Sequence, residues 1–364
     1  MVSLEEQLLL NSFEKVFMGA AGGGATLDIT DVFSTYLHTG NSASQPINNG
    51  IDLSGEGGLV WIKWRSGNNA FGHSLHDTER GVTKELHSDS TPAQSTEDRI
   101  SSFNSTGFSL TNNTETNLNA NYYVSWTFRK APKFFDVVTY TGSGSAKTVA
   151  HSLGSAPGMI IIKNTSVADP WAVYHRANTA APQTDYLVLN TTAATVDSAA
   201  WWNDTAPTSS VFTVGTDHSV NANGENYIAY IFAHNDSGDG EFGPDADQDI
   251  IKCGSYVSHE TSPPEITLGF EPQWILIKKS TGVDEWALFD NMRGVPTGGN
   301  DAMLRADLSS VEYDAANQID FTSTGFKLTT AGLGVTNAPT GETYIYMAIR
   351  RGPLAPPEAG TEVF

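Results

Sequence analysis

The chain has 364 residues and a formal net charge of −21, which disfavours binding to polyanions such as nucleic acids or anionic membrane surfaces. Its single cysteine excludes a disulfide framework and a cysteine-rich metal site. No apolar run reaches the roughly 18 residues of a membrane-spanning helix, and the acidic N-terminus does not read as a secretory signal.

The N-terminal segment differs from the rest of the chain. Residues 3–18 (SLEEQLLLNSFEKVFM) are expected to form a short amphipathic helix that ends at a glycine-rich break. Its apolar positions are Leu8, Leu9, Phe13, Val16 and Phe17. Because a lone helix of this length is marginal in water, it must pack either on its own domain or on a partner. The glycine break favours a partner, so residues 1–25 are predicted to anchor the chain.

Five sequence blocks then recur three times in the same order. Each copy opens with an aromatic strand and a glycine-rich turn, continues with an apolar strand ending in Ile-Lys, and closes with a tyrosine-rich strand. The lysines of the second block are Lys63, Lys163 and Lys278. Repetition at intervals of about 100 residues predicts three copies of one fold with the same strand order.

The repeated blocks read as short strands broken by Gly, Asn and Pro turns. The Ile-Lys strand and the closing strand are apolar at consecutive positions, which is typical of strands covered on both faces. One face would pack on the core of its own copy and the other on the next copy or another subunit. We therefore predict an all-β protein with three tandem β-sandwich modules at 26–133, 134–235 and 249–352. An acidic Gly-rich linker at 236–248 and a Pro-rich tail at 353–364 complete the chain.

The acidic linker offers the first candidate site. Carboxylates on a glycine-rich loop are the ligands that calcium prefers, although the spacing is not that of an EF-hand. The candidate ligands are Asp236, Asp239, Asp245 and Asp247. A solvated acidic linker without bound metal is the alternative. No other cofactor is expected.

A histidine cluster and the lone cysteine are weaker candidates for a functional site. His73, His76 and His87 could suggest a metal site, but His73 aligns with tryptophans in the other two copies, which indicates packing. Cys253 lies in an apolar strand, so it is expected to be buried. No motif of a known catalytic machinery is present, and no pair of acids recurs in all three copies. We therefore expect a protein that is not an enzyme.

Aromatic residues in a loop give the best candidate for ligand binding. Trp201 and Trp202 are followed by Asn203 and Asp204 in a Thr/Ala-rich segment. A sugar ring stacks on tryptophan, and the amide and carboxylate would bind its hydroxyl groups. We predict that Trp202 and Asn203 contact a glycan and that Trp201 turns inward. Packing of both rings under the loop is the alternative.

Several phrases carry a resemblance to a known group of proteins. They include DVFSTYLHTGN, GIDLSGEGGLVWIK, SWTFRKAPKFFDVVTYTG, HSLGSAPGMIIIK, NGENYIAYIFAHND, FGPDADQDIIKCGSY and GFEPQWILIK. The sequence resembles the repeat-module structural proteins of marine tailed bacteriophages. The resemblance implies lectin-like, jelly-roll β-sandwich modules displayed on the virion, and it transfers no catalytic residue.

Three functional hypotheses follow. The favoured one is a non-enzymatic tail-fibre or fibre-like appendage protein that attaches to other virion proteins by its N-terminus and contributes to recognition of host-surface glycans. A capsid decoration or tail-associated protein without a receptor is the alternative, and a tailspike-like glycan depolymerase is the remote one. Homo-oligomerisation would cover strands that are apolar on both faces and multiply a weak binding site, and the resemblance to tail-fibre proteins implies a trimer.

Overall fold

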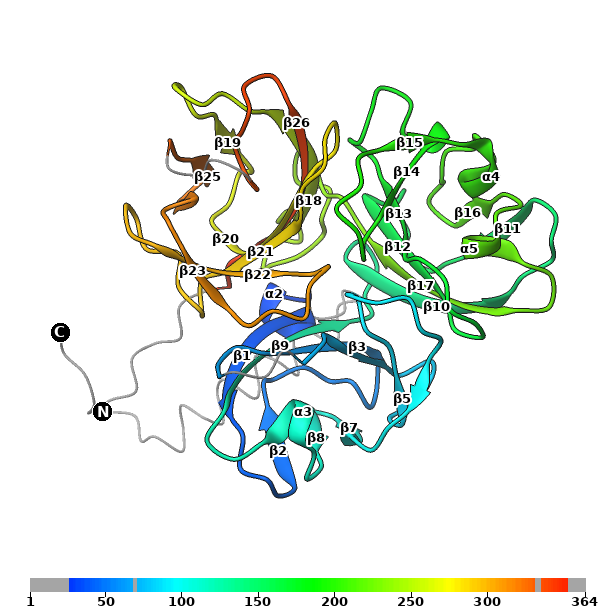
Figure 1. Ribbon diagram of the computed structural model, residues 1–364, viewed down its shortest axis with the longest axis vertical. Coiled ribbons are helices and arrows are strands. Elements are labelled where there is room, and N and C mark those ends of the chain that lie inside the picture. Colours follow the sequence, from blue (N-terminus) through cyan, green and yellow to red (C-terminus); the bar gives the residue numbers. More distant parts are fainter. Residues whose placement is uncertain (1–25, 68–70, 331–334, 353–364) are drawn as a thin grey trace.

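The computed structural model describes residues 26–67, 71–330 and 335–352 (Figure 1). The predicted N-terminal helix with its five apolar anchor residues, and the Pro-rich tail, lie outside the described residues. The described chain consists mainly of strands in antiparallel sheets, which confirms the all-β prediction. Within those ranges, no helix is long and apolar enough to cross a membrane.

The strands form three units that follow one another along the chain. Unit 1 contains α2 (Ile29–Val32), β1 (Phe33–Thr39), β2 (Gln45–Asn48), β3 (Gly58–Trp64), β4 (Ser74–Asp77), β5 (Lys84–Glu85), β6 (Ser95–Thr96), β7 (Ile100–Asn104), β8 (Gly107–Leu110), α3 (Thr114–Asn117) and β9 (Tyr122–Arg129). Unit 2 contains β10 (Phe135–Thr141), β11 (Lys147–Ala150), β12 (Met159–Asn164), β13 (Ala172–His175), η1 (Pro182–Thr184), β14 (Asp185–Val188), β15 (Val196–Asp197), α4 (Ala199–Trp202), β16 (Val211–Val214), α5 (His218–Asn221) and β17 (Asn226–Phe232). Unit 3 contains β18 (Ile251–Val257), β19 (Glu265–Thr267), β20 (Pro272–Lys279), β21 (Trp286–Asp290), β22 (Asp301–Arg305), β23 (Tyr313–Ala315), β24 (Ile319–Thr322), β25 (Gly325–Leu328) and β26 (Thr343–Arg350).

The main sheets of the three units share one strand order. It is β1-β9-β3-β4 in unit 1, β10-β17-β12-β13 in unit 2 and β18-β26-β20-β21 in unit 3, with two further strands at the end of the last two sheets. The register agrees as well, because each repeated lysine lies opposite an apolar residue of the closing strand. These pairs are Lys63 with Val124, Lys163 with Ile228, and Lys278 with Ile345. The main sheets of the three units therefore share one strand order, as the sequence repeat predicts.

One face of each main sheet packs on a smaller sheet of its own unit. The smaller sheets are β2-β8-β7, β11-β16 and β19-β25-β24. In unit 1, Val60 and Ile62 of β3 share a buried cluster with Phe108 of β8. In unit 3, Ile275 of β20 shares a cluster with Phe326 of β25. Alternate residues of the central strands therefore fill the interior of each unit, as the pleat of a strand requires.

The other face of each main sheet points to a core that all three units share, and Figure 1 shows the units arranged around this common centre. Leu59 and Trp61 alternate with the inward residues of β3 and belong to this core. The ring of Phe128 in unit 1 lies 5.5 Å from that of Phe232 in unit 2 and 6.0 Å from that of Trp274 in unit 3. The second faces are thus covered within one chain, so this covering no longer argues for an oligomer.

The segment predicted as an acidic linker is folded against the body. Phe242 is 2% exposed and belongs to the shared core. The side chain of Asn235 accepts hydrogen bonds from the backbone of Ile250 and Ile251 and donates one to the carbonyl of Lys133. The linker interpretation is therefore corrected: its acidic residues face solvent, but one buried aromatic ring and one buried amide fix the segment in place.

Candidate functional site

The three repeated lysines, here called the lysine triplet, join each unit to a neighbour. Their side chains are fully buried, and each ammonium group donates a hydrogen bond to a loop carbonyl of a different unit. The acceptors are Ser309 O for Lys63 at 2.9 Å, Thr91 O for Lys163 at 2.9 Å, and Thr192 O for Lys278 at 3.0 Å. Unit 1 thus binds unit 3, unit 2 binds unit 1, and unit 3 binds unit 2. Burial is the main cause that lowers the pKa of all three lysines to about 8.

A second equivalent position repeats the same connection. His73 and Trp171 immediately precede β4 and β13, and Trp286 is the first residue of β21. A ring nitrogen of each contacts a carbonyl of the neighbouring unit. The acceptors are Arg305 O for His73 at 2.9 Å, His87 O and Ser90 O for Trp171 at 2.9 and 3.1 Å, and Val188 O for Trp286 at 3.0 Å. Nδ1 of His73 accepts a hydrogen bond from the indole of Trp61, so both of its ring nitrogens have structural partners.

Each inserted loop meets the unit that receives it at a junction, and the three equivalent junctions are here called grooves 1/2, 3/1 and 2/3; pockets occur at the first two. Groove 1/2 is framed by Arg80, Gln94 and Thr165; groove 3/1 by Arg293, Glu312 and Arg65; groove 2/3 by Asn178, Thr195 and Ser280. In each groove the backbone N–H of the second residue donates to the carbonyl of the third, at 3.3, 3.1 and 2.8 Å respectively. The same frame therefore carries three different sets of side chains.

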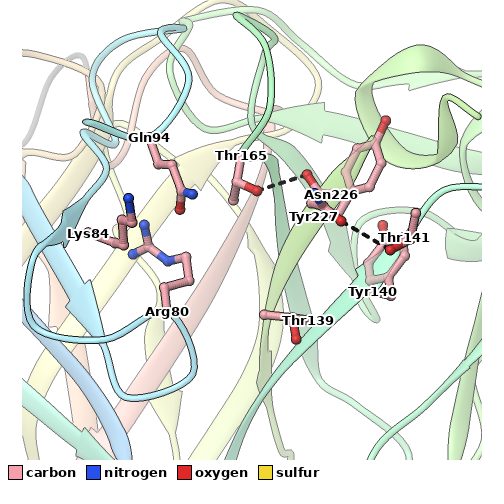
Figure 2. Close-up of a pocket in the computed structure, with 9 residues that line it drawn as sticks. All are labelled: Arg80, Lys84, Gln94, Thr139, Tyr140, Thr141, Thr165, Asn226 and Tyr227. Carbon is pink, nitrogen blue, oxygen red and sulfur yellow. Dashed lines mark hydrogen bonds between the residues drawn. The ribbon is translucent and has the colours of Figure 1, made fainter. Parts of the chain in front are cut away.

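Groove 1/2 holds a pocket of about 350 Å³, shown in Figure 2. Unit 1 supplies one wall with the cations Arg80 and Lys84 and the amide of Gln94. Unit 2 supplies the other wall, which consists of the hydroxyl groups of Thr139, Thr141 and Thr165, the amide of Asn226, and the rings of Tyr140 and Tyr227. Both walls thus carry polar groups beside apolar surface, and no carboxylate lines the pocket.

Arg80, on the wall that unit 1 supplies, is fixed by contacts with both units. Its side chain is 4% exposed, and its Nε lies 2.6 Å from Oδ2 of Asp77. The hydroxyl of Tyr230 in unit 2 donates to the same carboxylate oxygen at 2.8 Å. The remaining guanidinium nitrogen, Nη1, is buried and has no hydrogen-bond partner among the described residues. The same holds for Oε1 of Gln94, so two buried polar atoms of this pocket lack partners.

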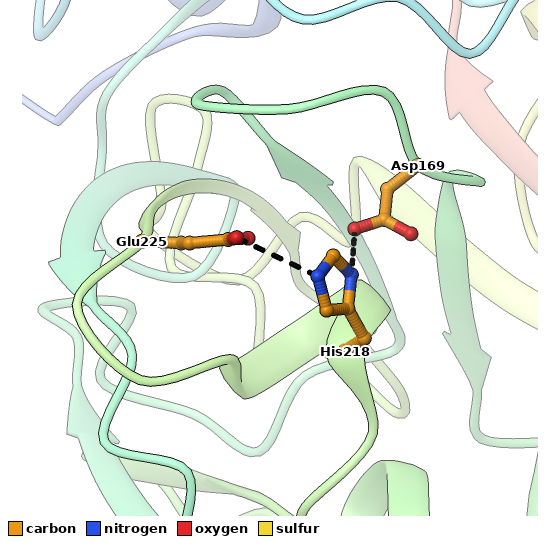
Figure 3. Close-up of side chains that lie close together, drawn as sticks. All are labelled: Asp169, His218 and Glu225. Atoms are coloured by element: carbon orange, nitrogen blue, oxygen red, sulfur yellow. Dashed lines mark hydrogen bonds and ion pairs between the residues drawn. The ribbon is translucent and has the colours of Figure 1, made fainter.

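A second group of polar side chains occurs in unit 2 alone. Figure 3 shows His218 of α5 between Asp169 and Glu225. Nδ1 lies 2.5 Å from Oδ2 of Asp169, and Nε2 lies 3.5 Å from Oε1 of Glu225. Although desolvation opposes it, the contact with Asp169 raises the pKa of His218. An imidazolium satisfies both carboxylates, so a divalent cation could bind here only after His218 lost its proton and one of these contacts.

The tryptophan pair is not a glycan-binding surface. Trp201 is 5% and Trp202 2% exposed. The indole of Trp202 donates to the carbonyl of Asp185 at 3.0 Å, and Trp201 stacks on Tyr186 with ring centroids 3.6 Å apart. The short helix α4 turns both rings inward, so the prediction that Trp202 stacks on a sugar is wrong.

The polar partners of that predicted site remain at the surface without a ring beside them. Asn203 caps α4 in a left-handed conformation, with φ of 53°, and Asp204 follows with φ of 47°. Both are exposed. Their role in the described structure is to end the helix and reverse the chain.

The four candidate calcium ligands do not converge. Asp236, Asp239, Asp245 and Asp247 are all exposed. In the described part of the chain, the group of three acidic or histidine side chains close enough to share a cation is the one around His218. The side chain of Asp236 instead pairs with Lys252 at 3.3 Å. The aspartates thus lie on a folded loop without a shared ligand position, and the calcium interpretation is corrected.

Sequence reasoning missed the residues of groove 1/2. Aligning HDTERG (76–81) with FDNMRG (289–294) would have placed Arg80 opposite Arg293 and revealed a repeated Asp–Arg pair. Nothing in the sequence indicates that Asp169, His218 and Glu225 meet, because loops and a short helix bring them together from distant positions.

Residues 28–353 match a family described as a domain of unknown function, DUF7483, so the match covers all three units. No curated protein sequence matches the chain.

Proposed function

Because the chain belongs to the DUF7483 family of domains of unknown function, its function must be argued from its own residues, and we propose that it is a non-enzymatic structural protein of a tailed-bacteriophage virion. In this proposal it is a tail-fibre or fibre-like appendage protein that contributes to recognition of host-surface glycans. The three units are lectin-like β-sandwich modules of the jelly-roll kind. The repeated phrases that resemble phage structural proteins support the assignment to a virion.

The observation that carries the proposal is the set of hydrogen bonds that closes the three units into one body. The lysine triplet and the rings of His73, Trp171 and Trp286 are buried, and all six bind carbonyl groups of a neighbouring unit. Buried ammonium groups and ring nitrogens can serve in catalysis, but in this chain they form the hydrogen bonds that hold the units together. This arrangement favours a rigid display platform over a catalytic domain.

A capsid decoration or tail-associated protein without a receptor is the second candidate. The compact arrangement around one shared core favours it, because an extended fibre would be expected to separate its modules. Burial of Trp202 also removes the glycan contact that the sequence suggested. Recognition of a ligand is still the favoured role, because groove 1/2 contains a pocket that a ligand could occupy.

Location on the particle is tested directly. Antibodies raised against residues 26–352 should label purified phage particles in electron micrographs, at the tail or fibres for the favoured role and over the capsid for the second. A chain found only in infected-cell lysate, and not in washed particles, overturns the virion assignment.

Attachment through the N-terminus is part of the same proposal. A chain that lacks residues 1–24 should fold, because the shared core is built from residues between Ile29 and Ile349, yet it should be missing from particles. Normal incorporation of this truncated chain contradicts the anchor.

A further inference from the structure

The three equivalent grooves differ in the charge at one position. In groove 3/1, Glu312 places its carboxylate 3.4 Å from Nη1 of Arg293 and forms two short contacts with Arg65, at 2.8 and 2.9 Å. In groove 2/3 the corresponding residues are neutral, and Thr195 donates to the amide oxygen of Asn178 at 2.7 Å. The cations of groove 3/1 are thus paired with a carboxylate, whereas groove 2/3 contains no charge at these positions, although Nδ2 of Asn178 is buried without a partner among the described residues.

Groove 1/2 keeps the arginine and lacks the carboxylate. Arg80 shares the Asp contact of Arg293 and one of its backbone contacts, because its Nη2 donates to Leu75 O at 3.1 Å, as that of Arg293 donates to Leu288 O at 2.9 Å. Gln94 stands where Glu312 stands in groove 3/1. Nη1 of Arg293 donates to Ala302 O at 3.1 Å and to Glu312 at 3.4 Å, whereas Nη1 of Arg80 is buried without a partner among the described residues. A buried, unpaired guanidinium nitrogen is costly, and an incoming anion would satisfy it.

A second cation strengthens this preference. Lys84 lines the same pocket, and its ammonium donates to the hydroxyl of Thr96 at 2.8 Å. It forms no ion pair within the part of the chain that the structure describes. Figure 2 shows Arg80, Lys84 and Gln94 together on one wall, facing the pocket. Two cations at one wall, in a chain with a formal charge of −21, mark a local site for an anion.

We propose that groove 1/2 binds the carboxylate of an acidic sugar, a uronic acid residue of a glycan. The sugar carboxylate takes the place that Glu312 fills in groove 3/1 and binds Arg80 and Lys84. The opposite wall offers hydroxyl and amide groups from Thr139, Thr141 and Asn226 for the sugar hydroxyls. This inference rests on the proposed role in glycan recognition and names the ligand class.

The size and lining of the pocket favour a sugar over a bare anion. A volume of about 350 Å³ is far more than a carboxylate or phosphate requires and lies in the range of small-molecule sites. The polar wall of unit 2 would remain unused by acetate. The strongly negative chain repels long polyanions, so short ligands are the appropriate probes.

The test is calorimetric titration of the purified full-length chain with D-glucuronate and D-galacturonate. Glucose serves as the neutral analogue, and acetate and phosphate serve as bare anions. We expect at least one uronate to bind, with glucose, acetate and phosphate each at least about tenfold weaker. Failure of both uronates to bind overturns the proposal, as does equal binding of glucose or of the bare anions.

The key variant is Gln94→Glu, which recreates the carboxylate of groove 3/1. It should bind uronate at least about tenfold more weakly, because its own side chain now pairs with Arg80. Gln183→Glu, which makes the same charge change in η1 outside the groove, should bind like the unmodified chain. Equal loss in both variants, or undiminished binding by Gln94→Glu, overturns the site.

Stability gives an independent readout of the same variant. Gln94→Glu should unfold at the same or a higher urea concentration than the unmodified chain, since the new carboxylate meets an unpaired cation. A clear loss of stability contradicts the reasoning. These measurements use purified protein, so their failure is separate from failure of the particle-labelling test of the virion assignment.

Discussion

Replacing Glu312 by Gln removes the anion that joins units 1 and 3 in groove 3/1. The carboxylate contacts Nε and Nη2 of Arg65 at 2.8 and 2.9 Å and Nη1 of Arg293 at 3.4 Å. The side chains of Glu312 and Arg65 are only 18% and 17% exposed, and that of Arg293 is fully buried. The Gln variant keeps the shape of the side chain and presents an N–H₂ group to two guanidinium groups.

The expected loss follows from these contacts. A hydrogen bond to a charged group contributes about 1.5–3 kcal/mol. Two such bonds are lost, but Arg293 keeps Asp290 and partial exposure weakens the pair with Arg65. The free energy of unfolding should therefore fall by about 2–4 kcal/mol.

Urea denaturation followed by circular dichroism measures this loss. Glu97→Gln is the matched control, because its carboxylate lies 3.9 Å from Arg99 and its side chain is 40% exposed. That control should lose less than about 0.5 kcal/mol. A double-mutant cycle with Arg65→Gln should assign most of the loss to the pair. If Glu312→Gln costs no more than the control, the pair does not hold units 1 and 3 together.

Two further predictions concern the buried groups. The lysine triplet has a folded pKa of about 8 against roughly 10.4 in an unfolded chain, so the unfolded state binds more protons between these values and stability should rise from pH 8 to pH 10. Burial also raises the pKa of Cys253 and of nine tyrosines, and their ionisation in the unfolded chain opposes this rise increasingly toward pH 10, so the rise should be clearest just above pH 8. Urea midpoints that fall from pH 8 to pH 10 would contradict the burial of the three lysines. In Lys163→Met the urea midpoint should rise less over this range than in the unmodified chain. Trp202→Ala should lower the free energy of unfolding by about 3–5 kcal/mol and leave uronate affinity unchanged; a stable variant with weakened binding would restore Trp202 as a ligand contact.

The repeat and its strand order could be predicted because periodic apolar residues determine both. In β3 every residue is buried, and alternate positions face two different cores. The sequence GLVWIKW shows that both faces need cover. It does not show what covers them. The hydrogen bonds between units run from the lysine triplet to backbone carbonyls, and every residue has a carbonyl, so the sequence does not identify the acceptors.

The failures at the candidate sites have equally local causes. Trp202 followed by Asn203 reads the same whether the ring lies on a surface or under a loop, and only the turn of α4 decides between them. Phe242 was the one apolar residue that could have shown the acidic segment to be folded. The sequence does not predict a role for Gln94, because only the structure shows that it lines a pocket with Arg80 in the position that Glu312 has in groove 3/1.

The three units share one core and should therefore unfold as one body. Equilibrium unfolding in urea tests this most directly, with tryptophan fluorescence reporting the shared core around Trp61, Trp126 and Trp274 and far-ultraviolet circular dichroism reporting the sheets. We predict one transition that both probes follow together, with a slope above the about 1–3 kcal/mol/M of small domains because the whole body is exposed at once. Separate transitions, with sheets that persist after the fluorescence has changed, would show independent modules and contradict the closed body.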